Sequence, residues 1–365
     1  MKTSICFVGC GRYAAEVLNE LNGNISFDLY FASRNESKSR SFAEKFNGKG
    51  YFGSYHEAAS ATYIDALYFL TPHNLHLENV KMGINNGKHV LIEKPIAHNL
   101  EDALEIVRLI RESNLVFMLA ENFRFLPTIV KSKELITSGV IGDLRLVQVQ
   151  RELNVNNSRD VNPLKTDDWR QDISKAGGGK FLDAGIHDVD AMVNLGGYPE
   201  SVYALEPPAL NKSSGLEDGM LVSAKMPDGA IGLIQFSFGT PIKGFRDNLW
   251  VTGTKGMLSF SSFGTKILLD TPAVSRTIRT GVHYMGMLGV FDEFISAIKT
   301  GKTPAMTAEN GLKDLEVVMA VYHSIQTGYP VNLTNAADYS KDSYQVPYQL
   351  KSPMLPKNYE PFSLL

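Results

Sequence analysis

Short apolar runs alternate with longer amphipathic segments through the first third of the chain. Apolar runs bounded by turn residues predict buried strands, and apolar residues at helical spacing predict helices. The predicted strands are 4–8, 27–32, 63–70, 116–120 and one within 88–95; the helices between them are 36–46, 77–86, 99–113 and one that ends at Leu21. Regular alternation of strand and helix is typical of a doubly wound parallel sheet, the Rossmann type of α/β fold.

The pattern changes near residue 123. A helix is predicted over 128–138, followed by a long strand over 144–153. Alternating apolar and polar runs then lie at 219–226, 230–238, 247–253 and 256–260, and two helical segments follow at 283–300 and 308–326. Alternation at a period of two predicts strands with one solvated face. We therefore expect an α+β domain with a large, open, mostly antiparallel sheet.

These patterns divide the chain into three segments. We predict a dinucleotide-binding Rossmann domain at 1–122, an α+β domain at 123–334 that binds substrate and mediates oligomerisation, and an extended tail at 335–365. The Asn-rich stretch 154–167 is predicted to be a loop or an insertion.

The composition is that of a soluble globular protein, with 44% apolar and 21% charged residues and a formal net charge of −3. This charge gives no electrostatic reason to expect nucleic acid or an anionic membrane as a partner. No apolar run approaches the length of a membrane span, so we expect a cytoplasmic protein. Cys6 and Cys10, on a strand and the turn after it, would lie about 13 Å apart. They are therefore predicted to be free thiols, and we expect no metal site.

A glycine motif follows the first predicted strand. Gly9-Cys10-Gly11-Arg12-Tyr13-Ala14 matches G-x-G-x-x-G/A, in which the glycines allow a tight turn and a close approach of a pyrophosphate. The next helix N-terminus would offer free N–H groups to the phosphates. The motif, placed between strand and helix, predicts a dinucleotide site, although glycine pairs also occur in ordinary turns.

The second predicted strand ends at Ser33-Arg34, where NAD-preferring folds place an acid. A hydroxyl and a guanidinium suit a 2′-phosphate, and Lys38 and Arg40 add positive charge. We therefore favour NADP, with NAD possible. A solvated turn that carries incidental basic residues is the alternative.

Two further strand ends should face the same crevice. Glu93-Lys94-Pro95 ends one strand, and desolvation of a lysine there would lower its pKa toward the range of proton transfer. The loop Thr71-Pro72-His73-Asn74-Leu75-His76 ends the other. One histidine is expected to line the cofactor pocket, because a third metal ligand is not evident.

A second chemical cluster follows three glycines, Gly177-Gly178-Gly179. On a helix, Asp183 and His187 are four residues apart and share one face. A carboxylate beside an imidazole raises its proton affinity and fixes its tautomer, as a proton relay requires. A half-exposed polar row without catalytic function is the alternative.

Together these motifs resemble the Gfo/Idh/MocA oxidoreductases, the family of glucose–fructose oxidoreductase and inositol dehydrogenase. The resemblance covers residues 4 to about 333 and includes the glycine motif, Thr71-Pro72 with His76, Glu93-Lys94-Pro95, Trp169-Arg170, and Gly177 to His187. It implies that Lys94, Asp183 and His187 surround the reacting substrate carbon, and that this domain order often forms homodimers or homotetramers. The cofactor-binding residues are then expected to be Gly9, Gly11, Arg12, Tyr13, Ser33, Arg34, Thr71, Pro72, Asn74, His76, Glu93, Lys94, Asn122, Trp169 and Arg170, with Arg124, His283 and Tyr284 as candidates for substrate binding.

The resemblance implies reversible hydride transfer at a secondary alcohol of a sugar, sugar derivative or cyclitol. His187 or Lys94 would remove the hydroxyl proton, and Asp183 would orient the pair. Two other functions occur on similar scaffolds, a dinucleotide-sensing regulator and a redox-assisted glycosidase that keeps its NAD.

Overall fold

The computed structural model describes residues 2–153, 169–209, 216–281 and 285–333. The predicted insertion at 154–167, the tail at 335–365, and the candidates His283 and Tyr284 lie outside these ranges. The chain forms two compact units, Met1–Phe125 with Tyr284–Leu312, and Leu126–His283 with Lys313–Leu365.

The first unit is built on a six-stranded parallel sheet with the order β3-β2-β1-β4-β5-β6. Its central strands β1 and β4 are buried except at Ser4, as expected of strands covered on both faces. The strands are β1 Ser4–Val8, β2 Asp28–Ala32, β3 Gly50–Phe52, β4 Ala66–Phe69, β5 His89–Ile92 and β6 Phe117–Leu119; the helices are α1 Arg12–Leu21, α2 Glu36–Lys45, α3 Tyr55–Ser60, α4 His76–Asn85 and α5 Leu100–Glu112. The predicted Rossmann fold is confirmed.

A late segment of the chain completes the core of this unit. Helix α9, Met287–Thr300, belongs to the first unit although the sequence pattern groups it with 123–334. The Phe291 ring stacks on Phe7 of β1 and on Phe27, with ring centroids 5.5 and 5.0 Å apart. The Rossmann core is therefore assembled from two stretches of chain that are far apart in the sequence.

The second unit contains a nine-stranded sheet with the order β14-β13-β12-β11-β7-β10-β9-β8-β15. Among the described strands of this sheet only β7 and β10 pair in parallel, so the predicted, mostly antiparallel sheet is confirmed. The strands are β7 Leu144–Leu153, β8 Ser201–Leu205, β9 Gly219–Lys225, β10 Ile231–Phe238, β11 Phe245–Gly253, β12 Met257–Phe260, β13 Lys266–Asp270, β14 Ser275–Arg279 and β15 Val331–Asn332; the helices are α6 Pro127–Thr137, α7 Ile173–Ala176, α8 Ile186–Gly196 and α10 Ala308–Thr327.

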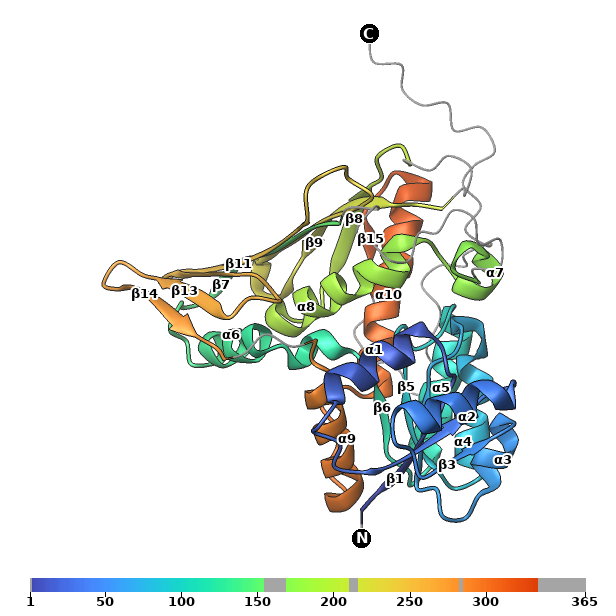
Figure 1. Ribbon diagram of the computed structural model, residues 1–365. Coiled ribbons are helices and arrows are strands. Elements are labelled where there is room, and N and C mark those ends of the chain that lie inside the picture. The colour runs from blue at the N-terminus through green and yellow to red at the C-terminus, as the bar shows by residue number, and fades with distance from the viewer. Residues whose placement is uncertain (1, 154–168, 210–215, 282–284, 334–365) are drawn as a thin grey trace. The chain divides into compact units, whose positions relative to one another are not determined.

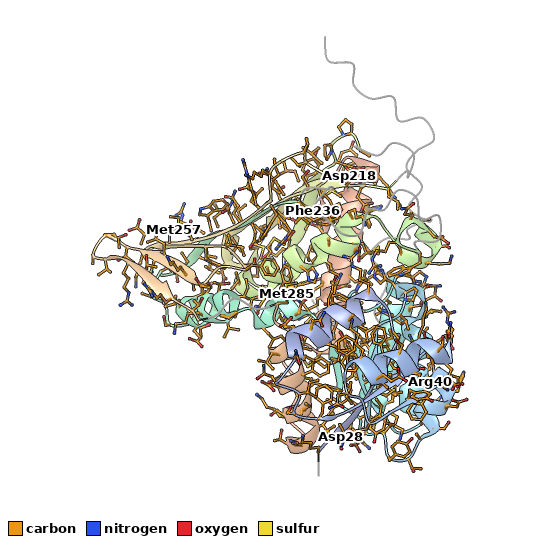
Figure 2. All side chains as sticks on the ribbon, in the orientation of Figure 1. Asp28, Arg40, Asp218, Phe236, Met257 and Met285 are labelled. Carbon is orange, nitrogen blue, oxygen red and sulfur yellow. The ribbon has the colours of Figure 1, made fainter. Side chains whose placement is uncertain are left out.

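Helices α6, α8 and α10 lie on one face of this sheet (Figure 1). Residues that point to that face, such as Phe236 (labelled in Figure 2), are buried, and their neighbours along each strand are more exposed. Leu221 and Ile231 are among the apolar residues on the other face, with 42% and 53% of their surface exposed. No helix in the described ranges covers that face, which is why the strands alternate in sequence.

Candidate active site

The glycine loop after β1 has the geometry of a phosphate-binding turn. Gly9 has a φ of +116°, and a Cβ there would lie 2.6 Å from the Leu70 carbonyl oxygen, so only glycine fits. A Cβ on Gly11 would instead meet nothing within 4 Å. Gly11 is also the N-cap of α1 and provides no side-chain cap, so no side chain of this residue occupies the helix N-terminus. This cradle suits a pyrophosphate.

Neighbouring side chains of the motif have different surroundings. Arg12 is exposed and paired with Glu16 at 3.0 Å on the helix surface. Tyr13 is partly buried and its hydroxyl lies 3.8 Å from the Met287 sulfur in α9. Burial, reinforced by Glu93, raises the pKa of Tyr13 well above its ordinary value. The Tyr13 phenol is therefore neutral.

Basic groups gather beside the glycine loop at the end of β2. The Ser33 hydroxyl accepts a hydrogen bond from Asn35 N at 3.2 Å. Arg34 is exposed, and its guanidinium hydrogen-bonds to Tyr55, which opposes the effect of burial on the Tyr55 pKa. The Lys38 ammonium is close enough to the Cys10 thiol to lower its pKa, although burial dominates and raises that pKa to about 12. Positive charge therefore borders the loop, as a 2′-phosphate would require.

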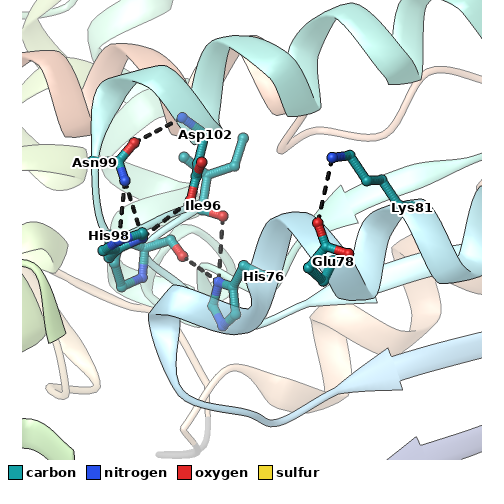
Figure 3. A network of polar contacts seen from close by, with 8 residues as sticks. His76, Glu78, Lys81, Ile96, His98, Asn99 and Asp102 are labelled. Atoms are coloured by element: carbon teal, nitrogen blue, oxygen red, sulfur yellow. Dashed lines mark hydrogen bonds and ion pairs between the residues drawn. The ribbon is translucent and has the colours of Figure 1, made fainter. Parts of the chain in front are cut away.

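The loop after β4 is tied to the loop after β5 by a buried imidazole. His76 has no exposed surface; its Nδ1 lies 2.9 Å from the Pro95 carbonyl oxygen and its Nε2 3.2 Å from that of Thr71. Figure 3 shows the ring directed at the adjoining Ile96 carbonyl as well. Burial lowers the pKa of His76 to about 4. His76 therefore holds the loops together, and its burial leaves no surface for the direct cofactor contact predicted from the sequence.

Other groups in the same loop remain available to a ligand. Asn79 donates to the Thr71 hydroxyl at 2.5 Å, which fixes that side chain, and Pro72 is partly exposed. The buried side-chain oxygen of Asn74 has no hydrogen-bond partner among the described residues. Buried polar atoms are normally paired, so this oxygen fits a site that binds a polar ligand.

Glu93 and Lys94 follow β5 at the edge of the sheet. The Glu93 carboxyl is buried and accepts a hydrogen bond from the Tyr68 hydroxyl. Burial raises its pKa from 4.5 to about 7, whereas Tyr68 and Lys94 oppose the shift. Lys94 is partly exposed, and the Lys94–Pro95 peptide is cis. A cation thus stands at the rim above a buried carboxyl group that can hold a proton at neutral pH.

Asn122 and Arg124 follow β6 in the same unit. The Asn122 side chain is buried and donates to the Met285 carbonyl oxygen at 2.5 Å, and Arg124 donates to that of Ala305 at 3.0 Å. Both side chains therefore anchor the returning segment around α9. Any role for them in binding cofactor or substrate stays a prediction.

In the second unit, Asp183 lies in a π-helical turn over Phe181–Gly185 that runs directly into α8. Such turns are rare and recur at functional sites. Leu182, Ile186 and Val189 are buried on one side of the helix, and His187 is partly exposed.

Two basic side chains, Arg170 and Lys180, lie beside the Asp183 carboxylate. Arg170 Nε lies 3.2 Å and Lys180 Nζ 4.0 Å from Asp183 Oδ2. The Arg170 guanidinium also stacks over the Trp169 ring, 4.4 Å from its centroid. Two of the motifs found in the sequence, Trp169-Arg170 and Asp183, are thus in contact through the Arg170 side chain. An ionised, oriented carboxylate follows from this arrangement.

A buried ion pair holds the opposite side of α8. Arg151 Nε of β7 lies 2.6 Å from Asp188 Oδ1, and Arg151 Nη2 lies 3.4 Å from Asp247 Oδ1 of β11. The sequence pattern does not reveal this network, since its members come from three elements. Its local signal is a charged residue at a position that continues the alternating buried series of Val147 and Val149.

Comparisons with known proteins agree with this architecture. Residues 3–121 match a family model described as an oxidoreductase family with an NAD-binding Rossmann fold, and residues 129–259 match a GFO/IDH/MocA C-terminal domain. The mouse trans-1,2-dihydrobenzene-1,2-diol dehydrogenase is 30% identical over 66% of this chain and 68% of its own. The NADP⁺ D-xylose 1-dehydrogenase 2 of Haloferax volcanii is 26% identical over 83% and 90%. An oxidoreductase of Thermotoga maritima with 27% identity has a TM-score of 0.78 over 93% of this chain and 100% of its own.

Fold, loop chemistry and these matches define an NAD(P)-dependent oxidoreductase that acts on CH–OH groups. The chain belongs to the Gfo/Idh/MocA family. Within the described ranges, no helix is both long and apolar enough to cross a membrane.

Proposed function

We propose that this protein prefers NADP and transfers hydride reversibly between the nicotinamide and a secondary alcohol or ketone of a sugar, sugar derivative or cyclitol. The observation that supports it most is the position of Lys94. Strands β1, β4 and β5 are neighbours in one parallel sheet, so Lys94 lies at the same sheet edge as the glycine loop. Ligands of doubly wound sheets bind at that edge.

The NADP preference rests on the charges at the end of β2. Ser33, Arg34 and Lys38 offer a hydroxyl and two cations where NAD-preferring sheets have an acid. The bound nicotinamide supplies the hydride chemistry, and Gly9, Gly11 and Asn74 fit the polar groups of such a dinucleotide.

The proton chemistry is assigned to Lys94, Asp183 and His187. Lys94 or His187 takes the hydroxyl proton during oxidation and returns it during reduction. Asp183 orients its partners, and Lys94 stabilises negative charge that develops on the substrate oxygen. Trp169 and Arg170 are proposed to contact the cofactor, since Arg170 pairs with Asp183 and stacks on Trp169.

We also propose a homodimer or homotetramer in the cytoplasm. The open sheet face, with Leu221 and Ile231 exposed, supports an interface between copies. Cys6 and Cys10 are both free, which suits a reducing compartment. Light scattering across a concentration series tests the oligomer: a monomer at every concentration would contradict it.

The function is tested with a panel of sugars and cyclitols, followed through absorbance of the reduced cofactor, with NADP⁺ and NAD⁺ in parallel. We expect Lys94→Ala to lower turnover about 10²–10⁴-fold while the NADP dissociation constant stays within about twofold, a change of only ~0.4 kcal/mol. Lys81→Ala, at a surface lysine paired with Glu78, is the control. Equal losses of turnover and affinity in Lys94→Ala would show that the lysine only binds cofactor.

A further inference from the structure

Gly178 and Gly179, two of the three glycines before Asp183, lie against two buried side chains of the second unit. A Cβ on Gly179 would lie 2.0 Å from Glu217 Oε2, and one on Gly178 would lie 2.5 Å from the Tyr322 hydroxyl. Gly177 ends α7 with a φ of +85°. Gly178 and Gly179 are therefore required by packing against Tyr322 and Glu217, and Gly177 by its backbone conformation.

Glu217 and Tyr322 hold the backbone of the turn through several hydrogen bonds. Glu217 Oε1 accepts from Gly179 N at 3.0 Å and from Phe181 N at 3.1 Å. The Glu217 carbonyl oxygen accepts from Lys180 N at 3.0 Å. The Tyr322 hydroxyl donates to Glu217 Oε1 at 2.5 Å and accepts from Leu182 N at 3.2 Å. Four consecutive N–H groups are thus bound immediately before Asp183.

The pair is buried, with 9% of Glu217 and 7% of Tyr322 exposed. Burial, with a smaller contribution from Glu206, raises the pKa of Glu217 from 4.5 to about 7, while Tyr322 and the Phe181 N–H oppose the shift. Retaining a carboxyl group there costs stability, so a purely structural N-cap would be served as well by a neutral side chain. A carboxylate that binds several N–H groups at once fixes the register of the turn more tightly.

We propose that Glu217, supported by Tyr322, is a positioning residue that sets the orientation of Asp183 toward Arg170 and Lys180. The inference rests on the proposed function, in which Asp183 orients the proton-transferring groups. Glu217 acts through the backbone from Gly179 to Leu182, and no contact of its own with substrate is required.

The chain offers a matched control at the other end of α8. The Tyr198 hydroxyl donates to Glu316 Oε2 at 2.6 Å, so a second Tyr–Glu pair, with a buried glutamate and a partly exposed tyrosine, follows the helix C-terminus. Glu217→Ala, Glu217→Gln and Tyr322→Phe are therefore compared with Glu316→Ala and Tyr198→Phe. Glu217→Gln keeps an acceptor for the N–H groups and is the conservative rescue.

The first measurement needs no substrate. The sequence contains two tryptophans, Trp169 and Trp250, so a Trp250→Phe background makes Trp169, which stacks on Arg170, the single reporter. We expect Glu217→Ala and Tyr322→Phe to shift Trp169 emission in folded protein, Glu217→Gln to restore it, and the Glu316 and Tyr198 variants to leave it unchanged. Unchanged emission in Glu217→Ala, or an equal shift in Glu316→Ala, would overturn the proposal.

The second measurement separates positioning from stability. With the best substrate of the panel, we expect kcat of Glu217→Ala to fall about tenfold or more, equivalent to ~1.4 kcal/mol, with KM for NADP unchanged and most of kcat regained in Glu217→Gln. If Glu217→Ala does not fold, Tyr322→Phe and Glu217→Gln carry both measurements. An inactive wild type with the expected emission pattern would refute the proposed function alone, whereas normal kcat in Glu217→Ala would refute the positioning role alone.

Discussion

The buried carboxyl of Glu93 should make the first unit less stable as the pH rises. Its pKa is raised from 4.5 to about 7 by burial, so the folded state holds this proton more tightly than the unfolded state. The favourable contribution is therefore complete below pH 4.5 and is lost as the pH rises toward 7. A shift of about 2.5 pKa units corresponds to roughly 3 kcal/mol in the free energy of unfolding.

Glu93→Gln tests this directly, because glutamine resembles the protonated acid and cannot ionise. We expect the free energy of unfolding of the wild type, minus that of Glu93→Gln, to fall by roughly 3 kcal/mol between pH 4.5 and 8. Urea denaturation followed by circular dichroism at several pH values measures it. Taking the difference removes the titration of all other groups.

The exposed Glu101 of the same unit provides the control. The free energy of unfolding of the wild type, minus that of Glu101→Gln, should not change over the same pH range. A Glu93→Gln difference that stays constant within about 0.5 kcal/mol, or that rises with pH, would refute the reasoning. Either result would mean that folding does not raise the pKa of the Glu93 carboxyl group.

Three further predictions test separate parts of the structure. Gly11→Ala should leave the free energy of unfolding within about 0.5 kcal/mol of the wild-type value but weaken NADP binding in a fluorescence titration. Gly9→Ala should instead lower the free energy of unfolding, because a φ of +116° is strained for alanine. Equal losses of stability in the two variants would contradict this. Arg34→Ala should weaken NADP binding about tenfold or more, as loss of a charged hydrogen bond does, and leave NAD binding unchanged; equal losses for both cofactors would reject the 2′-phosphate role. Arg151→Met should destabilise the second unit by about 3–5 kcal/mol, because it leaves the buried Asp188 carboxylate without its cation; urea denaturation followed by tryptophan fluorescence measures the loss. Adding Asp188→Asn should recover part of this stability. No recovery would show that the unpaired Asp188 charge is not the cause.

Local patterns predicted the elements that have strong periodicity. β1 and β7 follow from a continuous apolar run and a long alternating one, and their positions agree with the sequence to the residue. β3 and α3 were missed, because three partly exposed residues at a sheet edge carry no periodic signal. The nearby Tyr55, which binds Arg34, was missed with them.

Site residues that directly follow a strand could be predicted from the sequence. Contacts between residues far apart in the sequence could not. Gly9 and Lys94 are found from their strands, since parallel strands deliver their ends to one edge. The contact of Glu217 with Gly179 spans 38 residues, and no spacing rule relates them. His76 was assigned to the cofactor because its loop faces the crevice, but only the packed structure reveals that its ring is enclosed.

The return of α9 to the first unit affects how the protein is made. Phe291 fills the space between Phe7 and Phe27, yet a ribosome reaches it more than 160 residues after Phe125, the end of the first stretch of that unit. At 5–20 residues per second, that interval lasts on the order of ten seconds. During this time the nascent sheet has an uncovered aromatic surface, which a chaperone can shield, and an isolated 1–125 fragment would expose the same surface permanently.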